Sequence, residues 1–278
     1  MHNSGTFPHY TCMENSNVKK TAVVIGGSSG IGFETCLRLS NRGWNVINIS
    51  RTPCTIDKVE NIQADVTEGT ALTDIIRGVA DKPVSALVYS AGFSMAAPIE
   101  YAKENDYRYL FDVNFFGALQ AMQAIIPQMK QKGGRIVLVG SLGGDLPIMF
   151  DSFYSASKAA LEMLCRSAYS ELKPYGIKVT GVLPGGTATG FTFKRKVYTT
   201  DENKAYSGSV NKAVAALANM EQSGMSPTAV AEIIYSVLVE ENPPVIKSCG
   251  VKNAVYRAFT RVMPEKLTLK INERMYNQ

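Results

Sequence analysis

Short apolar segments rich in β-branched residues alternate along the chain with longer segments in which apolar residues recur every three or four positions. The short segments predict strands at Thr21–Ile25, Asn45–Ser50, Val59–Gln63, Val84–Tyr89, Arg135–Val139, Lys178–Leu183 and Pro244–Lys247. The longer ones predict helices at Gly32–Asn41, Glu104–Met129, Phe153–Lys173 and Pro227–Glu240. Several strands are apolar throughout, as expected when helices cover both faces of a sheet. The pattern therefore predicts an α/β fold of one domain with a doubly wound parallel sheet.

Three segments lie outside this alternation. Residues 1–18 are polar and contain no apolar signal sequence, so we expect a flexible N-terminal extension before a catalytic domain at 19–278. The segment 190–226 has weak periodicity and follows a strand, where a long insertion usually covers a binding site. The tail 252–278 alternates apolar and basic residues and is interrupted at Pro264. It is a lid over the substrate, a segment resting on a membrane surface, or a tail packed on its own domain.

Composition and charge exclude several classes of protein. The chain has 278 residues and a net charge of +5, with no basic face of the kind that binds nucleic acid. Its densest basic cluster, Lys194-Arg195-Lys196, is interpreted as a solvated loop. The five cysteines form no CxxC pair, which indicates reduced thiols and a cytoplasmic location. No apolar segment approaches the ~18 residues of a membrane span, so we expect no transmembrane segment, although peripheral contact stays open.

Histidine limits the chemistry further. The chain has only His2 and His9, and both lie in the N-terminal extension. A Ser-His-Asp triad or a His-bearing metal site would therefore depend on that extension, and we expect no metal site. Proton transfer must come from tyrosine, lysine or carboxylate side chains.

A glycine-rich turn connects the first predicted strand to the first helix, and its sequence is Gly26-Gly27-Ser28-Ser29-Gly30-Ile31-Gly32. Glycines permit the tight turn, let the backbone approach a pyrophosphate and let the helix pack close to the sheet. The exposed N–H groups and the helix dipole favour the bound anion. Because the strand–turn–helix context is present, the segment predicts a dinucleotide site in a Rossmann fold.

The end of the second strand predicts which dinucleotide binds. NAD-preferring sites place an Asp or Glu there for the ribose 2′-hydroxyl, whereas this chain has Ser50-Arg51-Thr52. A carboxylate would repel a 2′-phosphate, and Arg51 can bind it by charge-assisted hydrogen bonds. The alternative is that Arg51 is an ordinary surface arginine. Asp65 and Val66, after the third strand, are expected beside the adenine.

Lysine follows tyrosine by four residues at Tyr154–Lys158 and at Tyr169–Lys173. At this spacing both side chains lie on one helix face, so the ammonium is close to the phenol. Their contexts differ, because Ser141 lies 13 residues before Tyr154 at a strand end, whereas Ala156 lies at that distance before Tyr169. The first pair is therefore the catalytic candidate.

With these motifs in order, the segment from about Lys20 to Gly250 resembles the classical short-chain dehydrogenase/reductase family. The residues that carry the resemblance are the glycine-rich turn, Asp65, Ser90-Ala91-Gly92, Asn114, Ser141, Tyr154-Ser-Ala-Ser-Lys158 and Pro184-Gly185. Two positions depart from the family pattern, since Ile25 replaces the usual Thr before the first glycine and Ser90 replaces the usual Asn. Both usual residues make structural hydrogen bonds around the cofactor.

The resemblance implies roles for these residues. Tyr154 is then the acid/base, Ser141 binds the reacting oxygen, Lys158 holds the ribose and lowers the tyrosine pKa, and Asn114 positions a water. The residues implied to bind the cofactor, NADP(H), are Gly26, Ser28, Ser29, Gly30, Ile31, Gly32, Arg51, Asp65, Val66, Ala91, Gly92, Tyr154, Lys158, Pro184, Gly185, Thr187 and Thr189. The family also implies a homodimer or homotetramer.

The substrate is an alcohol or a carbonyl compound. Gly140-Ser141 resembles the hydroxysteroid dehydrogenase branch, which favours a bulky apolar substrate such as a steroid, a retinoid or another lipid-like molecule. Six apolar residues are candidates for the pocket wall, namely Leu142, Leu146, Met149, Phe150, Phe191 and Phe193. Two alternatives stay open: a carbonyl reductase of small polar substrates, and a nucleotide-sensing regulator without turnover.

Overall fold

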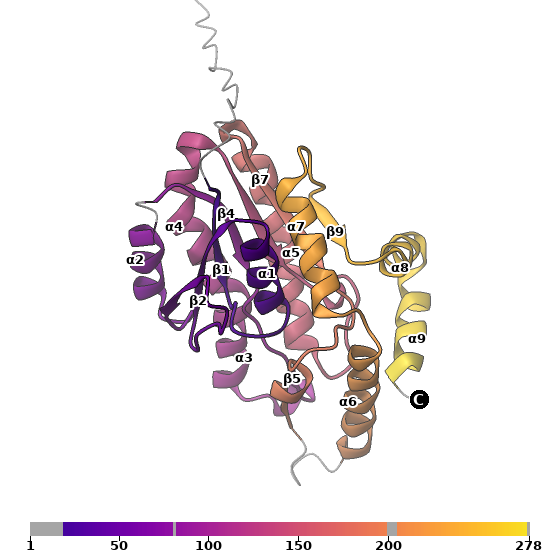
Figure 1. Ribbon diagram of the computed structural model, residues 1–278. Helices are drawn as coiled ribbons and strands as arrows, with labels where there is room; N and C mark the ends of the chain where they lie inside the picture. The colour runs from indigo at the N-terminus through magenta and orange to yellow at the C-terminus, as the bar shows by residue number, and fades with distance from the viewer. Residues whose placement is uncertain (1–18, 80–81, 199–204, 277–278) are drawn as a thin grey trace, which may run out of the picture.

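The computed structural model describes residues 19–79, 82–198 and 205–276. A seven-stranded parallel sheet runs through the centre (Figure 1). Its strand order is β3-β2-β1-β4-β6-β7-β9. The strands are β1 (Thr21–Ile25), β2 (Asn45–Ser50), β3 (Val59–Gln63), β4 (Val84–Tyr89), β6 (Gly134–Val139), β7 (Ile177–Leu183) and β9 (Ile246–Ser248). The order reverses beside β1, at the β1–β4 pair, and such a switch point opens a crevice at the carboxyl ends of the strands.

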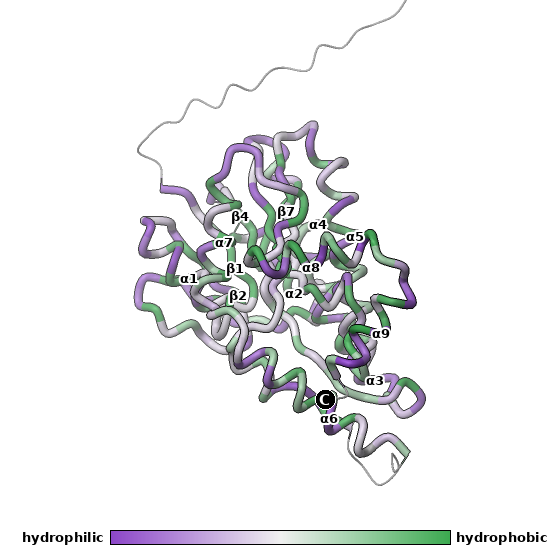
Figure 2. The backbone as a smooth tube through the Cα atoms, turned by 90° about the vertical axis from the view of Figure 1, so that its right-hand side faces the viewer, coloured by the Kyte–Doolittle hydropathy of each residue, from purple (hydrophilic) through white to green (hydrophobic). Residues whose placement is uncertain are grey.

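Helices cover both faces of the sheet because the apolar strands project buried side chains in both directions. The side chains of α2 (Gly69–Val79), α4 (Gly117–Lys132) and α5 (Ser152–Leu172) form one core with the strands. The side chains of α1 (Gly30–Asn41) and α7 (Pro227–Val239) form a second core on the opposite face. In Figure 2 hydrophobic segments, coloured green, accordingly lie in the middle of the molecule around β1 and β7. The predicted single-domain Rossmann architecture is confirmed.

The long helix predicted at Glu104–Met129 is interrupted. It consists of α3 (Glu104–Phe111), a π-helical turn at Asp112–Phe116 and α4. Asn114 lies in the π turn, where its side chain donates to the Phe93 carbonyl and to Ser157 Oγ, both at 3.0 Å. Turns of this kind are frequent at functional sites.

The segment 190–226 contains regular structure that the sequence pattern missed. Helix α6 (Ser207–Gln222) fills its second half, and β8 (Lys196–Val197) pairs with β5 (Met95–Ala96). Helix α2 was missed as well. Helix α6 buries Val210, Ala213 and Leu217, but its glycine, alanines and polar positions give a weak signal in the sequence. Helix α2 is amphipathic and buries Leu72, Ile76 and Val79, so its pattern was readable and was overlooked.

The C-terminal tail forms two helices, α8 (Val251–Val262) and α9 (Glu265–Tyr276). The buried Arg257 of α8 forms ion pairs with Asp145 and Glu162. Tyr276 of α9 packs against Ala213 and Leu217 of α6, which lies beside α9 (Figure 1). The described tail is therefore packed on the domain, and no described helix is long and apolar enough to cross a membrane.

Candidate active site

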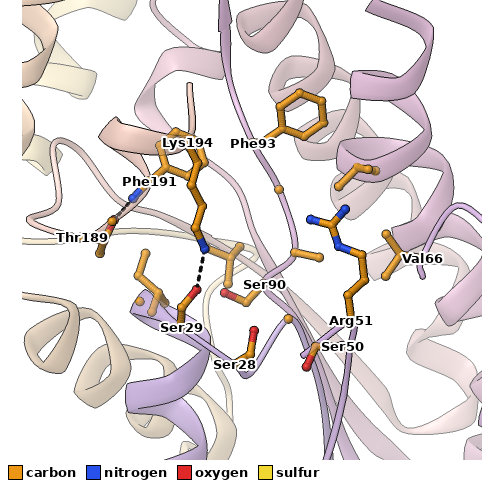
Figure 3. A pocket seen from close by; sticks show the side chains of 18 of the residues that line it. Ser28, Ser29, Ser50, Arg51, Val66, Ser90, Phe93, Thr189, Phe191 and Lys194 are labelled. Atoms are coloured by element: carbon orange, nitrogen blue, oxygen red, sulfur yellow. Dashed lines mark hydrogen bonds between the residues drawn. The ribbon is translucent and has the colours of Figure 1, made fainter. Parts of the chain in front are cut away.

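A cleft of about 690 Å³ lies at the carboxyl ends of β1, β2 and β4. Most residues that the sequence assigned to the cofactor line it: Gly26, Ser28, Ser29, Gly30, Ile31, Arg51, Asp65, Val66, Ala91, Gly92, Tyr154, Lys158, Pro184, Thr187 and Thr189. Gly32 and Gly185 are not among its lining residues. Segments distant in the sequence thus meet around one cavity, and Figure 3 shows Ser28, Ser29 and Arg51 around it.

The glycine-rich turn has the shape that close approach to a ligand requires. Gly26 and Gly30 have φ values of 85° and 56°, in the left-handed region that glycine tolerates. A Cβ on Gly32 would lie 2.1 Å from the Gly26 carbonyl oxygen, so α1 packs tightly onto the turn. Gly32 therefore shapes the turn from behind the cleft, as the motif predicts.

A buried asparagine of β2, Asn48, holds the glycine-rich turn. Its buried Oδ1 accepts a hydrogen bond from the Gly27 N–H at 2.8 Å, while its Nδ2 donates to Ser50 and Asn61. The Ser90 N–H donates to the Ile25 carbonyl at 2.9 Å. The turn is thus held although Ile25 and Ser90 replace the usual residues. Sequence reasoning missed Asn48, whose position inside a strand gives no signal.

An arginine, Arg51, lines the cleft just after the end of β2. The Arg51 side chain is 70% exposed, and its Nη1 lies 3.9 Å from Asp65 Oδ2. Arg51 Nη1 also donates to the Tyr109 hydroxyl at 3.1 Å. Figure 3 shows Arg51 beside Val66, across the cleft from Lys194. A guanidinium held by one neutral and one distant acidic partner keeps N–H donors available for an anion.

Tyr154, Lys158 and Ser141 meet at the inner end of the cleft. Helix α5 places Tyr154 and Lys158 four residues apart on its buried face, and the Lys158 Nζ lies 5.8 Å from the centroid of the Tyr154 ring. Lys158 Nζ donates to the Val139 carbonyl at 3.0 Å. Ser141 follows β6, and its Oγ accepts from the Gly143 N–H at 3.0 Å. The competing Tyr169 packs against the core, and neither it nor Lys173 lines a cavity described here.

Burial sets the proton affinities of this pair. Desolvation raises the pKa of Tyr154 above its usual range, and a hydrogen bond with Ser141 opposes that rise. Desolvation also lowers the pKa of Lys158 to about 8. Both effects disfavour the charged form of the group concerned. The phenol is therefore a weak base in this structure, and a positive charge close to it would favour tyrosinate.

Asn114 is absent from the cleft lining. Its Oδ1 accepts from the Phe93 N–H at 3.0 Å, and its Nδ2 donates to Phe93 and Ser157. The side chain therefore braces the strand end near Gly92, where a Cβ would lie 3.2 Å from Asn114 Oδ1. The water-positioning role implied for Asn114 stays a prediction.

A second cavity of about 1100 Å³ adjoins the first. Ser141, Tyr154, Phe191 and Glu221 line both cavities, so the two meet at the tyrosine. The walls are mainly apolar and come from the segment 190–226 and from both tail helices, including Val255, Tyr256, Phe259, Met275 and Tyr276. Gly185 lines this cavity, and a Cβ there would lie 2.7 Å from Asn253 Nδ2 of α8.

The apolar candidates for the pocket wall divide into two groups. Leu142, Leu146 and Phe191 line the second cavity. Met149 and Phe150 do not, because they pack against α6 and Tyr276. Phe193 also belongs to the group that does not line the second cavity, because it is 83% exposed on the surface.

The interpretation of Lys194-Arg195-Lys196 as a solvated loop is wrong for Arg195. Lys194 points into the cofactor cleft, where its Nζ lies 3.5 Å from Ser29 Oγ (Figure 3). The Arg195 side chain is only 1% exposed and pairs with Glu221 at 2.5 Å. Lys194 is nevertheless exposed, and Lys196 is 52% exposed and paired with Asp106. Helix α6 covers Arg195, and the sequence pattern had not predicted that helix.

Asp151 and Glu221 were missed as well. Asp151 precedes α5 and is 1% exposed, and Glu221 lies near the end of α6. A buried carboxylate is rare unless it is paired or functional, but nothing in the local sequence distinguishes these two from surface acids. Their partners are distant in the sequence.

The comparisons with known proteins agree with this geometry. The family model described as short chain dehydrogenase matches residues 20–198. A 3-ketodihydrosphingosine reductase of Bacteroides thetaiotaomicron is 31% identical over 227 residues, which cover 80% of this chain and 84% of that protein. Human 17-beta-hydroxysteroid dehydrogenase type 1 is 31% identical over 194 residues, covering 63% of this chain and 59% of that protein. A solved short-chain dehydrogenase from Streptomyces avermitilis is 29% identical with a TM-score of 0.79, covering 92% of this chain and 96% of that one.

Proposed function

The chain belongs to the short-chain dehydrogenase family and is similar to its hydroxysteroid dehydrogenases, and on this premise we propose that it is an NADP(H)-dependent oxidoreductase that interconverts a secondary alcohol and a ketone. One observation carries the proposal. The nucleotide cleft and the apolar cavity meet at Tyr154 and Ser141, with Lys158 on the same helix face as the tyrosine. A carbonyl group at this junction would lie between a dinucleotide and a proton donor.

We assign the proton transfer to Tyr154. When bound, the cofactor supplies or accepts the hydride. The Tyr154 hydroxyl gives its proton to the developing alkoxide, while Ser141 Oγ donates a hydrogen bond to the same oxygen. Lys158 holds its ammonium below the phenol and near Gly92, where it stabilises tyrosinate and binds the ribose. Asn114 keeps the main chain at Phe93 in position.

The preference for NADP(H) over NAD(H) rests on Arg51. Its exposed guanidinium occupies the strand end where NAD-preferring sites hold a carboxylate. Lys194 adds a second positive charge, at the glycine-rich turn beside Ser29. Because Lys194 lies across the cleft from Arg51, it would face groups that both dinucleotides share, and the preference for the extra phosphate rests on Arg51 alone.

The substrate class rests on the second cavity. Its volume of about 1100 Å³ exceeds the ordinary range for a ligand pocket, and its lining is mainly apolar. The names of two relatives point to lipid-like substrates, since one is a ketodihydrosphingosine reductase and the other a hydroxysteroid dehydrogenase. We therefore favour a bulky apolar alcohol or ketone over a small polar carbonyl compound.

A carbonyl panel tests the proposal. Steroid, retinoid, long-chain and small polar ketones are incubated with NADPH, and the loss of NADPH absorbance is followed. We expect turnover of at least one bulky apolar ketone, with kcat/KM above that of every small polar one. Binding of NADPH without turnover of any member of the panel would favour a nucleotide-sensing regulator instead.

Removal of Pro264 and the residues after it tests the lid role of the tail. Helix α9 contributes Asn272, Met275 and Tyr276 to the cavity wall, but no residue to the nucleotide cleft. We expect the truncated protein to show a severalfold higher KM for bulky ketones with an unchanged KM for NADPH. Loss of co-sedimentation with liposomes would favour the membrane alternative. A lower melting temperature with unaltered kinetics would leave the tail a purely structural role.

We also propose a cytoplasmic homodimer or homotetramer. Phe116, at the entry to α4, and Met163 of α5 are 45% and 63% exposed, and the family resemblance implies that these helices pack against a second subunit. Light scattering at micromolar concentration should give a mass of at least two chains. A monomeric mass would contradict this assembly.

A further inference from the structure

A buried arginine of the tail, Arg257 of α8, joins two segments that meet at the active site. Its Nη2 donates to Glu162 Oε1 of α5 at 2.6 Å, and its Nε donates to Asp145 Oδ2. Asp145 ends the short turn that begins at Ser141. The side chains of Arg257, Glu162 and Asp145 are 10%, 7% and 20% exposed. One guanidinium thus connects the turn that carries Ser141 with the helix that carries Tyr154.

The turn between Ser141 and Asp145 is a compact unit. The Gly143 N–H donates to Ser141 Oγ at 3.0 Å, and the Gly144 N–H donates to the Ser141 carbonyl at 3.1 Å. The Asp145 N–H donates to the Leu142 carbonyl at 3.1 Å. Because these bonds connect the two ends of the turn, a displacement of Asp145 is passed on to Ser141.

The turn packs directly on α5 beside the catalytic candidates. A Cβ on Gly144 would lie 2.8 Å from the carbonyl carbon of Lys158. Glu162 follows Lys158 by four residues and lies on the same helix face, so Arg257 spans the contact between turn and helix. Ser141 itself forms a hydrogen bond with Tyr154. The position of Ser141 relative to Tyr154 therefore depends on how this turn is held against α5.

Two other arginines contact the same carboxylates less completely. The Arg261 Nη2 lies 3.5 Å from Asp145 Oδ1 and 3.7 Å from Glu162 Oε1, and its side chain is 50% exposed. Arg166 pairs with Glu162 at 2.5 Å from within the same helix. An exposed ion pair contributes little, whereas the loss of one partner from a buried pair is costly. Arg257 is therefore the main contact that holds the turn to α5.

We propose that Arg257 is a positioning residue, which holds the turn of Ser141 against α5 so that Ser141 and Tyr154 reach the same substrate oxygen. Arg257 lines neither cavity and acts through Ser141. Helix α8 then has two roles, because it also contributes Val255 and Phe259 to the wall of the apolar cavity. The inference rests on the proposed oxidoreductase function and adds to it a residue of the tail.

A double-mutant cycle tests whether Arg257 acts through Ser141. A displacement of about 1 Å can cost about a hundredfold in rate, so we expect Arg257→Gln to lower kcat for a bulky ketone roughly tenfold. The dissociation constant of NADPH, measured by fluorescence titration, should stay unchanged. In a Ser141→Ala protein the same substitution should cost less than about twofold, because the group that Arg257 positions has been removed. Equal losses of kcat in the two backgrounds would overturn the proposal.

Three further variants separate positioning from general stability. Arg166→Gln removes a partner of Glu162 but none of Asp145, and it should leave kcat unchanged. Arg257→Lys keeps the positive charge and should retain more activity than Arg257→Gln. Asp145→Asn weakens the same contact from the turn side, so the cycle with Ser141→Ala can be completed even when Arg257→Gln does not fold. An unchanged kcat in a folded Asp145→Asn protein would contradict the positioning role.

Hydrogen exchange followed by mass spectrometry keeps the test independent of turnover. In Arg257→Gln or Asp145→Asn, the amides of residues 141–146 should exchange at least about tenfold faster than in the wild type. The amides of residues 26–32, in the glycine-rich turn, should exchange at the wild-type rate. Unchanged exchange at 141–146 overturns the positioning role and leaves the oxidoreductase proposal standing. Lack of turnover of every ketone overturns the proposed function, while the exchange still decides whether Arg257 holds the turn.

Discussion

Replacing Tyr154 with phenylalanine is expected to lower kcat at least about a hundredfold while NADPH binding stays within about twofold of wild type. The phenylalanine ring still fills the buried space beside Phe191, whose ring centroid lies 5.9 Å from that of Tyr154. The variant loses only the hydroxyl that carries the transferable proton. Stopped-flow kinetics at saturating ketone measure the loss, and fluorescence titration measures NADPH binding.

The chain offers a matched control in Tyr169→Phe. Tyr169 lies on the same helix as Tyr154 and has the same spacing to a lysine, which begins the turn after that helix, but it packs against the core and lines neither cavity. This variant should keep wild-type turnover. An active Tyr154→Phe with an inactive Tyr169→Phe would show that the wrong pair has been assigned.

Replacing Arg51 with aspartate is expected to reverse the cofactor preference. The wild-type protein should use NADPH with a higher kcat/KM than NADH, because the exposed guanidinium can bind the 2′-phosphate. A hydrogen bond to a charged group contributes roughly 1.5–3 kcal/mol, so its loss costs about tenfold or more in kcat/KM for NADPH. The new carboxylate also repels the 2′-phosphate and accepts the 2′-hydroxyl of NADH.

Arg77→Asp is the control for this charge reversal. Arg77 is an exposed residue of α2 and does not line the nucleotide cleft. It should leave the ratio of kcat/KM for NADPH to that for NADH unchanged. A wild-type protein that prefers NADH would make Arg51 a surface residue without a role in cofactor choice.

The strands were predictable because their physical signal is local. The predicted Thr21–Ile25 and Val84–Tyr89 are the strands found, since continuous apolar sequences of this length are buried on both faces. Helix α6 was not predictable to the same degree. Its buried face includes Val210, Ala213 and Leu217, but the small alanine gives little amphipathic contrast. Contacts with α9, distant in the sequence, help to hold it in place.

The nucleotide cleft could be located from motifs, whereas the buried ion pair of Arg195 with Glu221 could not. Glycines and the Tyr154–Lys158 spacing carry their chemistry within one turn and one helix. The burial of Arg195 depends instead on Glu221, 26 residues further along, and on Ser94, 101 residues earlier. In the sequence Arg195 stands between two lysines and resembles a surface residue. Long-range packing alone distinguishes it.

The central claim is that hydride passes between a nicotinamide cofactor and a carbonyl carbon at Tyr154. The most direct test follows the hydride itself. The protein is incubated with a bulky ketone that it turns over and with NADPH that carries deuterium at C4, on one face in the first reaction and on the opposite face in the second. Mass spectrometry should find one deuterium on the carbinol carbon of the alcohol for one of the two labels and none for the other. NADPH oxidation without deuterated alcohol from either label would contradict the claim.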